Sequence, residues 1–109
     1  MTKQGKKSVS CSVETTIGAI GGKWKVLVLY FLLEETKRFN ELHRLLGGIS
    51  HRTLAKQLRE LEKDGIIKRK IFEQIPPKVE YSLTDIGREL KPVLMKMHEW
   101  GEKHSNIKK

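Results

Sequence analysis

A mainly α fold with one small β-hairpin is expected for this chain of 109 residues. Apolar residues recur with the period of a helix as far as Asp64. The period then changes to strand-like alternation between Ile66 and Leu83, and helical spacing returns after Thr84. The length suits one domain, and the content of 38% hydrophobic and 32% charged residues is ordinary for a globular protein.

The first two helices are expected to follow each other closely. Helical apolar spacing starts at Val13 and stops at the Gly21–Gly22 pair, where glycine supplies the left-handed cap conformation at little cost. The second helix, expected over Lys23–Leu33, is apolar on nearly all sides. Such a helix belongs in the middle of a core.

Two shorter helices are expected next. The third carries a buried face between Phe39 and Leu46, and Asn40 is its expected N-cap. The fourth is expected to start at the N-cap Ser50, to run to about Asp64 and to close at Gly65.

A hairpin and a last helix complete the chain. Alternation in 67–71 and 79–83 predicts two antiparallel strands, and the Pro76–Pro77 pair marks the tip between them because proline cannot sit in a central ladder. Thr84 is the expected cap of the last helix, and Pro92 should bend or break that helix near the preceding turn. Two short helices joined by a turn and followed by a hairpin describe a winged helix-turn-helix.

The expected fourth helix has two opposed stripes. One side carries leucines at helical spacing, at positions 54, 58 and 61. The other carries four cations within roughly a quarter turn, namely Arg52, Lys56, Arg59 and Lys63. A lone basic helix is usually a solvated charged face. The formal net charge of +9, however, favours a polyanionic partner, either nucleic acid or an anionic membrane surface, and the helix-turn-helix order favours double-stranded DNA.

A recognition helix contacts base edges mainly through its N-terminal residues. Arg52, Thr53 and Gln57 are therefore expected to read bases, since Arg pairs with guanine, Gln with adenine, and a hydroxyl with several groups. Ser50, Lys56 and the wing residue Lys78 are expected mainly to hold phosphates, and Arg38 and Asn40 could add phosphate contacts. The full set expected to contact DNA is Arg38, Asn40, Ser50, His51, Arg52, Thr53, Lys56, Gln57 and Lys78.

The expected wing is basic through Lys68, Arg69, Lys70 and Lys78. Such a hairpin can lie along phosphates or reach the minor groove. The alternative is that its lysines keep an exposed edge strand from pairing with other chains.

Several sequence blocks together resemble one known family. The blocks CSVETTIGAIGGKW, RFNEL, IS-R-L--QLRELE-DGII-R and PPKVEYSLTDIG occur in this order, followed by Trp100. They closely resemble the HxlR-type winged helix-turn-helix regulators, relatives of the MarR group, from Cys11 to Trp100. The resemblance implies a prokaryotic transcriptional regulator, more commonly a repressor, that binds a pseudo-palindromic operator as a homodimer.

The resemblance also implies a three-helix core flanked by N- and C-terminal dimerisation helices. The residues implied at the dimer interface are Val13, Ile17, Leu90, Val93, Leu94, Met97 and Trp100. The stripe on the last helix could instead pack on the chain's own core, and a helix with so many large apolar residues is expected to do both. Two-fold symmetry would place two recognition helices about one turn of DNA apart.

Some members of that family use a cysteine near the start of the first helix as a thiol switch, and Cys11 stands at that position. A helix N-terminus favours the reactive thiolate, Lys6 and Lys7 could help, and Glu14 opposes it. Many other members carry the cysteine with no demonstrated sensing. The sequence has no second cysteine, so oxidation would give an intersubunit disulfide, a mixed disulfide or an adduct.

No enzyme, metal site or cofactor is expected. The sequence shows no nucleophile–base motif and no phosphate loop, and its four histidines lack the spacing of metal ligands on one helical face. An oxidant or small-molecule effector fits the resemblance, but the sequence does not identify it. The competing hypothesis is a winged-helix module that binds proteins, or that coats nucleic acid without sequence choice.

The expected boundaries are a flexible basic N-terminus over 1–10, a single domain over 11–104 and a frayed tail over 105–109. The longest apolar run is too short to span a membrane, and the N-terminus lacks the apolar core of a signal peptide. A cytoplasmic, nucleoid-associated protein with no membrane partner is therefore expected.

Overall fold

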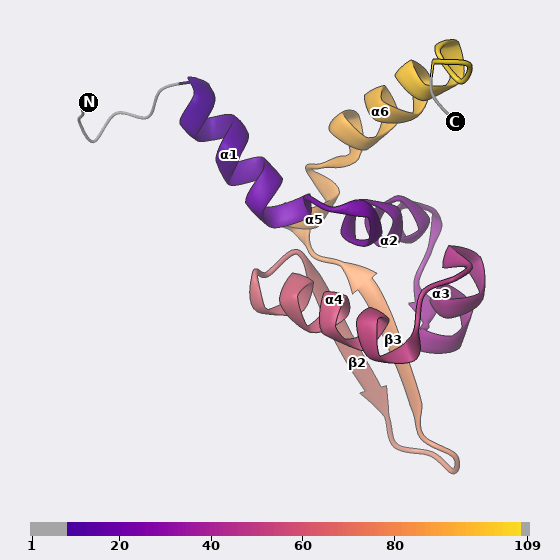
Figure 1. Cartoon of the computed structure of the whole chain (residues 1–109). Coiled ribbons are helices and arrows are strands. Elements are labelled where there is room, and N and C mark those ends of the chain that lie inside the picture. Colours follow the sequence, from indigo (N-terminus) through magenta and orange to yellow (C-terminus); the bar gives the residue numbers. More distant parts are fainter. Residues whose placement is uncertain (1–8, 108–109) are drawn as a thin grey trace.

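The computed structural model describes residues 9–107. Its elements are α1 (Val9–Ile20), α2 (Lys23–Glu34), β1 (Lys37–Arg38), α3 (Phe39–Leu46), α4 (His51–Lys63), β2 (Ile67–Phe72), β3 (Lys78–Leu83), α5 (Asp85–Arg88) and α6 (Lys91–Lys103). Figure 1 shows a central body of α2, α3, α4 and the sheet, with α1 and α6 projecting on one side and the β2–β3 hairpin on the other. The predicted winged helix-turn-helix is confirmed.

The helix α2 forms the middle of the core, as its all-round apolar sequence predicted. Val28, Leu29 and Leu32 are buried there, and α3, α4, α6 and the sheet pack around it. No single helix in the described part of the chain is long and apolar enough to cross a membrane. The segments 11–20 and 23–34 reach that length and composition together, across a bend of 77°.

The terminal segments differ slightly from the expected boundaries. The helix α1 begins at Val9, two residues inside the segment expected to be flexible. Residues 1–8 of that segment, and residues 108–109 of the expected tail, lie outside the described residues.

The start of α3 corrects one prediction. Asn40 is not the N-cap, because the helix already begins at Phe39 and Arg38 occupies the cap position. The backbone N–H of Arg38 donates a hydrogen bond to Glu41 Oε1 at 2.8 Å, which satisfies a donor that the helix leaves free. The helix starts this early because the strand β1 ends at Arg38 and leads into it directly.

The sheet is antiparallel with strand order β1-β3-β2. In the predicted hairpin, Ile67 pairs with Leu83 at one end and Phe72 pairs with Lys78 near the tip. The strand β1 was not predicted, and it pairs with β3 through Lys37 opposite Tyr81. Two residues are too few to show alternation, so periodicity could not predict this strand.

The predicted last helix is broken, as Pro92 indicated. Thr84 Oγ1 accepts a hydrogen bond from the backbone N–H of Gly87 at 3.1 Å and caps the short α5. Pro92 then lies in the first turn of α6, where its missing N–H costs no helical hydrogen bond. A Cβ at Gly87 would collide with the carbonyl oxygen of Ile66, so this glycine lets α5 lie against the start of the hairpin.

Candidate nucleic-acid interface

The two stripes predicted for α4 are confirmed. Leu54, Leu58 and Leu61 are at most 1% exposed and fix the helix against the core. This anchoring turns the opposite side of α4 to solvent. The exposed cations on that side, called the α4 stripe from here on, are Arg52, Lys56, Arg59 and Lys63.

Acidic neighbours of the α4 stripe are engaged by cations from other elements. Lys25 Nζ of α2 lies 2.8 Å from Glu60 Oε1, and Arg69 Nε of β2 lies 3.5 Å from Glu62 Oε2. The hydrogen bond from Lys25 lowers the pKa of the Glu60 carboxyl below its usual value. Burial raises the pKa of Tyr81, and Arg69 beside it opposes that shift. The hydrogen bond from Lys25 is the largest favourable contribution at Glu60, and the charges of Lys56 and Arg59 on the α4 stripe also lower its pKa. The two carboxylates therefore join α4 to α2 and to the wing.

The predicted cap at the start of α4 is confirmed. Ser50 Oγ accepts a hydrogen bond from the backbone N–H of Thr53 at 3.0 Å and donates one to Thr53 Oγ1 at 2.9 Å. The Ser50 proton is thus used within the cap, whereas Thr53 keeps its own hydroxyl proton. Thr53 and Gln57 are half-buried, whereas Arg52 is exposed, so Arg52 is the most accessible of the three residues expected to read bases.

An aromatic stack joins α3 to α4 and was not predicted. The His51 ring lies face to face with the His43 ring, with centroids 3.9 Å apart and planes 8° apart. It is also nearly parallel to Phe39, with centroids 5.8 Å apart. Phe39 and His43 are four residues apart, so they share a face of α3. The spacing of Phe39 and His43 is visible in the sequence, but it could not show that the His51 ring packs on that face of α3.

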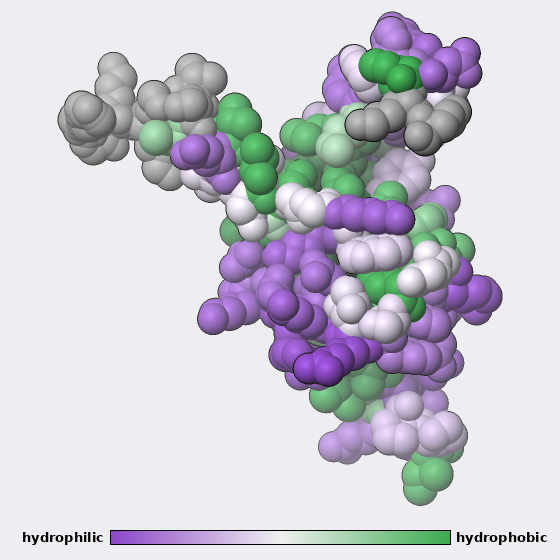
Figure 2. All heavy atoms as spheres, in the orientation of Figure 1, coloured by the Kyte–Doolittle hydropathy of each residue, from purple (hydrophilic) through white to green (hydrophobic). Residues whose placement is uncertain are grey.

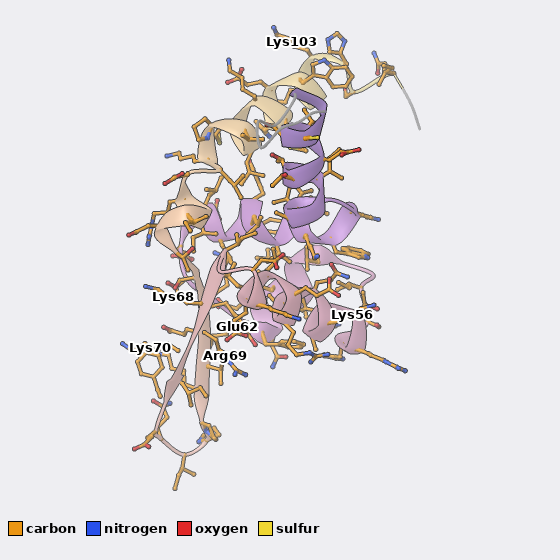
Figure 3. All side chains as sticks on the ribbon, turned by 90° about the vertical axis from the view of Figure 1, so that its left-hand side faces the viewer. Lys56, Glu62, Lys68, Arg69, Lys70 and Lys103 are labelled. Carbon is orange, nitrogen blue, oxygen red and sulfur yellow. The ribbon has the colours of Figure 1, made fainter. Side chains whose placement is uncertain are left out.

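Two expected phosphate ligands lie on the sheet rather than beside the α4 stripe. In the strand register, Arg38 of β1 lies opposite Glu80, and Lys78 of β3 lies opposite Phe72. Figure 3 shows Lys68 and Lys70 leaving β2 on the side away from α4, whereas Arg69 points toward Glu62. The residues expected to contact DNA are therefore divided between two surfaces.

Large apolar side chains are exposed on α1 and α6. Val13, Ile17, Val93, Met97 and Trp100 are each at least 42% exposed. The prediction that Leu94 lies at the dimer interface is corrected, because this side chain is 2% exposed and packs in the chain's own core. Leu90 is half-buried against that core. Figure 2 shows hydrophobic side chains gathered on α1 and α6, and hydrophilic ones over α4.

Cys11 lies exposed in the first turn of α1. Lys6 and Lys7, expected to favour its thiolate, lie outside the described residues. Within residues 9–107, no three His, Cys, Asp or Glu side chains are grouped so that they could hold a metal ion.

Comparison with known proteins identifies relatives of the whole fold. A sequence model of the HxlR-like helix-turn-helix family matches residues 19–109. YdeP of Bacillus subtilis (strain 168), an uncharacterized HTH-type transcriptional regulator, is 55% identical over 96 residues, which cover 88% of this chain and 75% of YdeP. YybR of the same strain, described in the same words, is 50% identical over 97 residues, covering 89% of this chain and 78% of YybR.

Solved structures agree with this relationship. The redox regulator HypR in its oxidized form is 52% identical, with a TM-score of 0.84 over 86% of this chain and 97% of that one. Its reduced form is 50% identical, with a TM-score of 0.85 over 88% and 95% of the two chains. The reduced form of the transcriptional regulator YodB from B. subtilis is 31% identical, with a TM-score of 0.75 over 90% and 96%.

Proposed function

The chain belongs to the HxlR-like helix-turn-helix family, whose relatives are transcriptional regulators rather than enzymes, and we propose that it is a homodimeric repressor that binds one operator sequence selectively. The observation that carries this proposal is the α4 stripe, an exposed row of cations on the second helix of a helix-turn-helix. The ion pairs of the neighbouring carboxylates Glu60 and Glu62 are made with Lys25 and Arg69, outside the row, and all four cations of the row are exposed.

The N-terminal half of α4 would enter the major groove. Arg52 would grip the two acceptors of a guanine, with Thr53 and Gln57 contributing at adjacent bases. Lys56 would hold the phosphate backbone and set the register without reading sequence. The Ser50 cap and the His43–His51 stack would keep the first turn of α4 in place for these contacts.

The dimer would form through the apolar side chains of α1 and α6. Val13, Ile17, Met97 and Trp100 are exposed in the single chain, and an apolar surface of this kind commonly marks a protein interface. A two-fold pair would place two copies of α4 about 34 Å apart, which matches successive major grooves of a pseudo-palindromic site.

Selective recovery of genomic DNA tests the proposal. The purified protein should retain a few fragments that share a pseudo-palindrome, and it should bind them at least about a thousandfold more tightly than random duplex. Removal of the gene should raise transcription beside those fragments if the protein represses them. Equal affinity for recovered and random duplexes would favour the competing hypothesis of a module that coats nucleic acid without sequence choice.

Control by oxidants or electrophiles is a second proposed property. Cys11 is exposed in the first turn of α1, beside the proposed dimer surface, and two solved relatives are forms of a redox regulator. Diamide or a quinone should change operator affinity in the wild-type protein but not in Cys11→Ser. The same response in both proteins would remove Cys11 from the mechanism.

A further inference from the structure

A groove of about 380 Å³ lies between two segments that are far apart in the sequence. One wall comes from residues 32–36, at the end of α2 and just beyond it. The other wall comes from Ser82 and Leu83 at the end of β3, from Arg88 of α5 and from Lys91 of α6. This groove is called the polar groove from here on. The α4 helix does not line it, so the proposed contact with DNA does not use it.

The wall of the polar groove at the end of α2 carries an excess of negative charge. Its two carboxylates, Glu34 and Glu35, share one cation, the buried Lys37. Lys37 Nζ lies 3.1 Å from Glu35 Oε2 and 3.7 Å from Glu34 Oε1. One ammonium against two carboxylates leaves this wall with one negative charge.

The opposite wall carries an excess of positive charge. Arg88 forms one ion pair, at 3.4 Å, with Asp85 of its own short helix. Lys91 has no ion pair among residues 9–107. Within the part of the chain that the structure describes, no ion pair joins Glu34 or Glu35 to Arg88 or Lys91. Opposite charges therefore line the two sides of the groove without neutralising each other directly.

A second groove, of about 280 Å³, adjoins the polar groove and is called the apolar groove. The two grooves share Leu33, Glu34 and Lys91, and the apolar groove is completed by Tyr30 and Met95. Hydrophobic surface thus begins where the charged walls end. Ligand pockets commonly combine apolar surface with a few polar groups that fix the orientation of the ligand.

The proposed dimer leaves both grooves open. Lys91 and Met95 are four residues apart and share one face of α6. Val93 and Met97, at the proposed dimer surface, are also four residues apart but are offset from the first pair by two positions, which places them on a different face. A ligand in the grooves would therefore not compete with the second subunit.

Two simpler explanations account for less of this arrangement. A surface of mixed charges that only serves solubility would explain the four charged residues, but not a groove that continues into an apolar one. A ligand of a single charge would be attracted by one wall and repelled by the other. A ligand that carries both charges at one end and an apolar group at the other matches all three features.

We propose that the two grooves bind a free α-amino acid with a large apolar or aromatic side chain. Its carboxylate would accept hydrogen bonds from the Arg88 guanidinium and the Lys91 ammonium. Its ammonium would donate to the Glu34 carboxylate, and its side chain would lie against Tyr30 and Met95. The inference goes beyond the proposed function, and its test needs no DNA.

Isothermal titration calorimetry of the full chain at low salt tests the site with a matched set of small molecules. L-Phenylalanine and L-leucine carry both charges and an apolar side chain. Phenylpropionate lacks the ammonium, phenethylamine lacks the carboxylate, and glycine lacks the side chain. Each of the last three molecules removes one of the three features that the grooves are proposed to recognise.

Two variants test the two charged walls separately. Glu34→Gln removes the carboxylate proposed to bind the ammonium, and Lys91→Gln removes one cation proposed to bind the carboxylate. The matched controls are Glu99→Gln and Lys96→Gln, which remove the same charges from an ion pair on α6 outside both grooves. Circular dichroism and thermal melting check folding, and Lys91→Gln tests the site alone if Glu34→Gln proves unfolded.

L-Phenylalanine or L-leucine should bind once per chain with a dissociation constant of about 1 mM or below. Loss of either charged end from the ligand should weaken binding about tenfold or more, as for one charge-assisted hydrogen bond. Glycine should also bind at least about tenfold more weakly, because it buries no side chain. Glu34→Gln should no longer distinguish L-phenylalanine from phenylpropionate, and Lys91→Gln should no longer distinguish it from phenethylamine. Both controls should behave as the wild-type protein does.

Three results would overturn the proposal. The first is the absence of saturable binding of both amino acids at concentrations about tenfold above the expected dissociation constant. The second is equal affinity for an amino acid and for the molecules that lack one of its charges. The third is wild-type affinity in both groove variants, which would place the bound amino acid elsewhere on the chain. None of these results bears on operator binding through α4, so a failure here is separate from a failure of the proposed function.

Discussion

Arg52 and Lys56 lie one turn apart on the exposed side of α4, yet their chemistry predicts different roles on DNA. The Arg52 guanidinium can form two parallel hydrogen bonds with a guanine edge, whereas the Lys56 ammonium acts as a point charge. Both side chains are exposed, so replacement of either one should leave the core intact. Affinity changes in these variants therefore report on contacts with DNA.

Arg52→Ala should cost about 1–3 kcal/mol of operator binding and relax preference at one base position. Lys56→Ala should weaken binding to operator and random duplex alike and lower the salt slope by about 1. Quantitative footprinting over a salt series, with a panel of single-base operator changes, measures both effects. An Arg52→Ala protein with unchanged affinity and preference would show that α4 is not the reading helix.

Two helix starts show when the local preference for N-cap residues predicts the cap correctly and when it does not. Ser50 was predicted as an N-cap and is one, because its hydroxyl meets the backbone N–H of Thr53 without help from distant residues. Asn40 was predicted by the same rule, and that prediction was wrong. The start of α3 is set by the pairing of Arg38 with Glu80 across the sheet, a contact between residues far apart in the sequence.

The stack of His43, His51 and Phe39 connects α3 to the first residue of α4. Phe39 packs against the core, His43 follows it on the same helix face, and the His51 ring lies against both. The first residue of α4 is thereby fixed to the preceding helix. In the proposed complex, this stack would limit how far α4 can tilt in the major groove of the DNA.

His43→Ala should weaken operator binding by roughly three- to tenfold. This range is the interaction free energy of one aromatic pair expressed as a change in the dissociation constant. His43→Phe should restore most of that loss, because it keeps a planar ring without the ring nitrogens. Gel-shift titration measures the affinity, and thermal melting serves as the control for folding. If His43→Phe binds as weakly as His43→Ala, the nitrogens matter rather than the stack.

The elements after the hairpin were predicted more accurately than their arrangement. Thr84 and Pro92 indicated a cap and a break, and α5 and α6 have both. The sequence did not show that Gly87 must pass close to the Ile66 carbonyl group. It also did not show which residues of the α6 stripe would be buried, since Leu94 and Met97 fit the same periodicity.

At the scale of the whole molecule, the proposed dimer surface and the α4 stripe lie on different elements. Val13, Ile17, Met97 and Trp100 are exposed on α1 and α6. These two helices project from the body, whereas α4 lies in the body (Figure 1). Such a division suits a dimer that joins at one end and holds two reading helices at the other. In the proposed dimer, two half-sites would be bound together, so operator affinity should depend on the apolar side chains of α1 and α6 as well as on the α4 stripe.

Met97→Glu should convert the proposed dimer to a monomer, because it places an unpaired charge in an apolar interface. Operator affinity should fall by at least about a hundredfold as the second half-site is lost. Analytical ultracentrifugation gives the mass, and gel shift gives the affinity. Ile86→Glu, at an exposed residue of α5, is the control and should remain dimeric. A dimeric Met97→Glu protein would contradict this arrangement of the subunits.

Periodicity and local capping were enough to predict the helices, the hairpin and the α4 stripe. These features depend on residues within a few positions of one another, as with Leu54 and Leu58 on one side of a helix. Tertiary packing decided the rest: the burial of Leu94, the folding of His51 onto α3, and the placement of Lys70 and Lys78 on a face that points away from α4. Each of these depends on residues far apart in the chain coming together, and spacing along one segment carries no information about such a meeting.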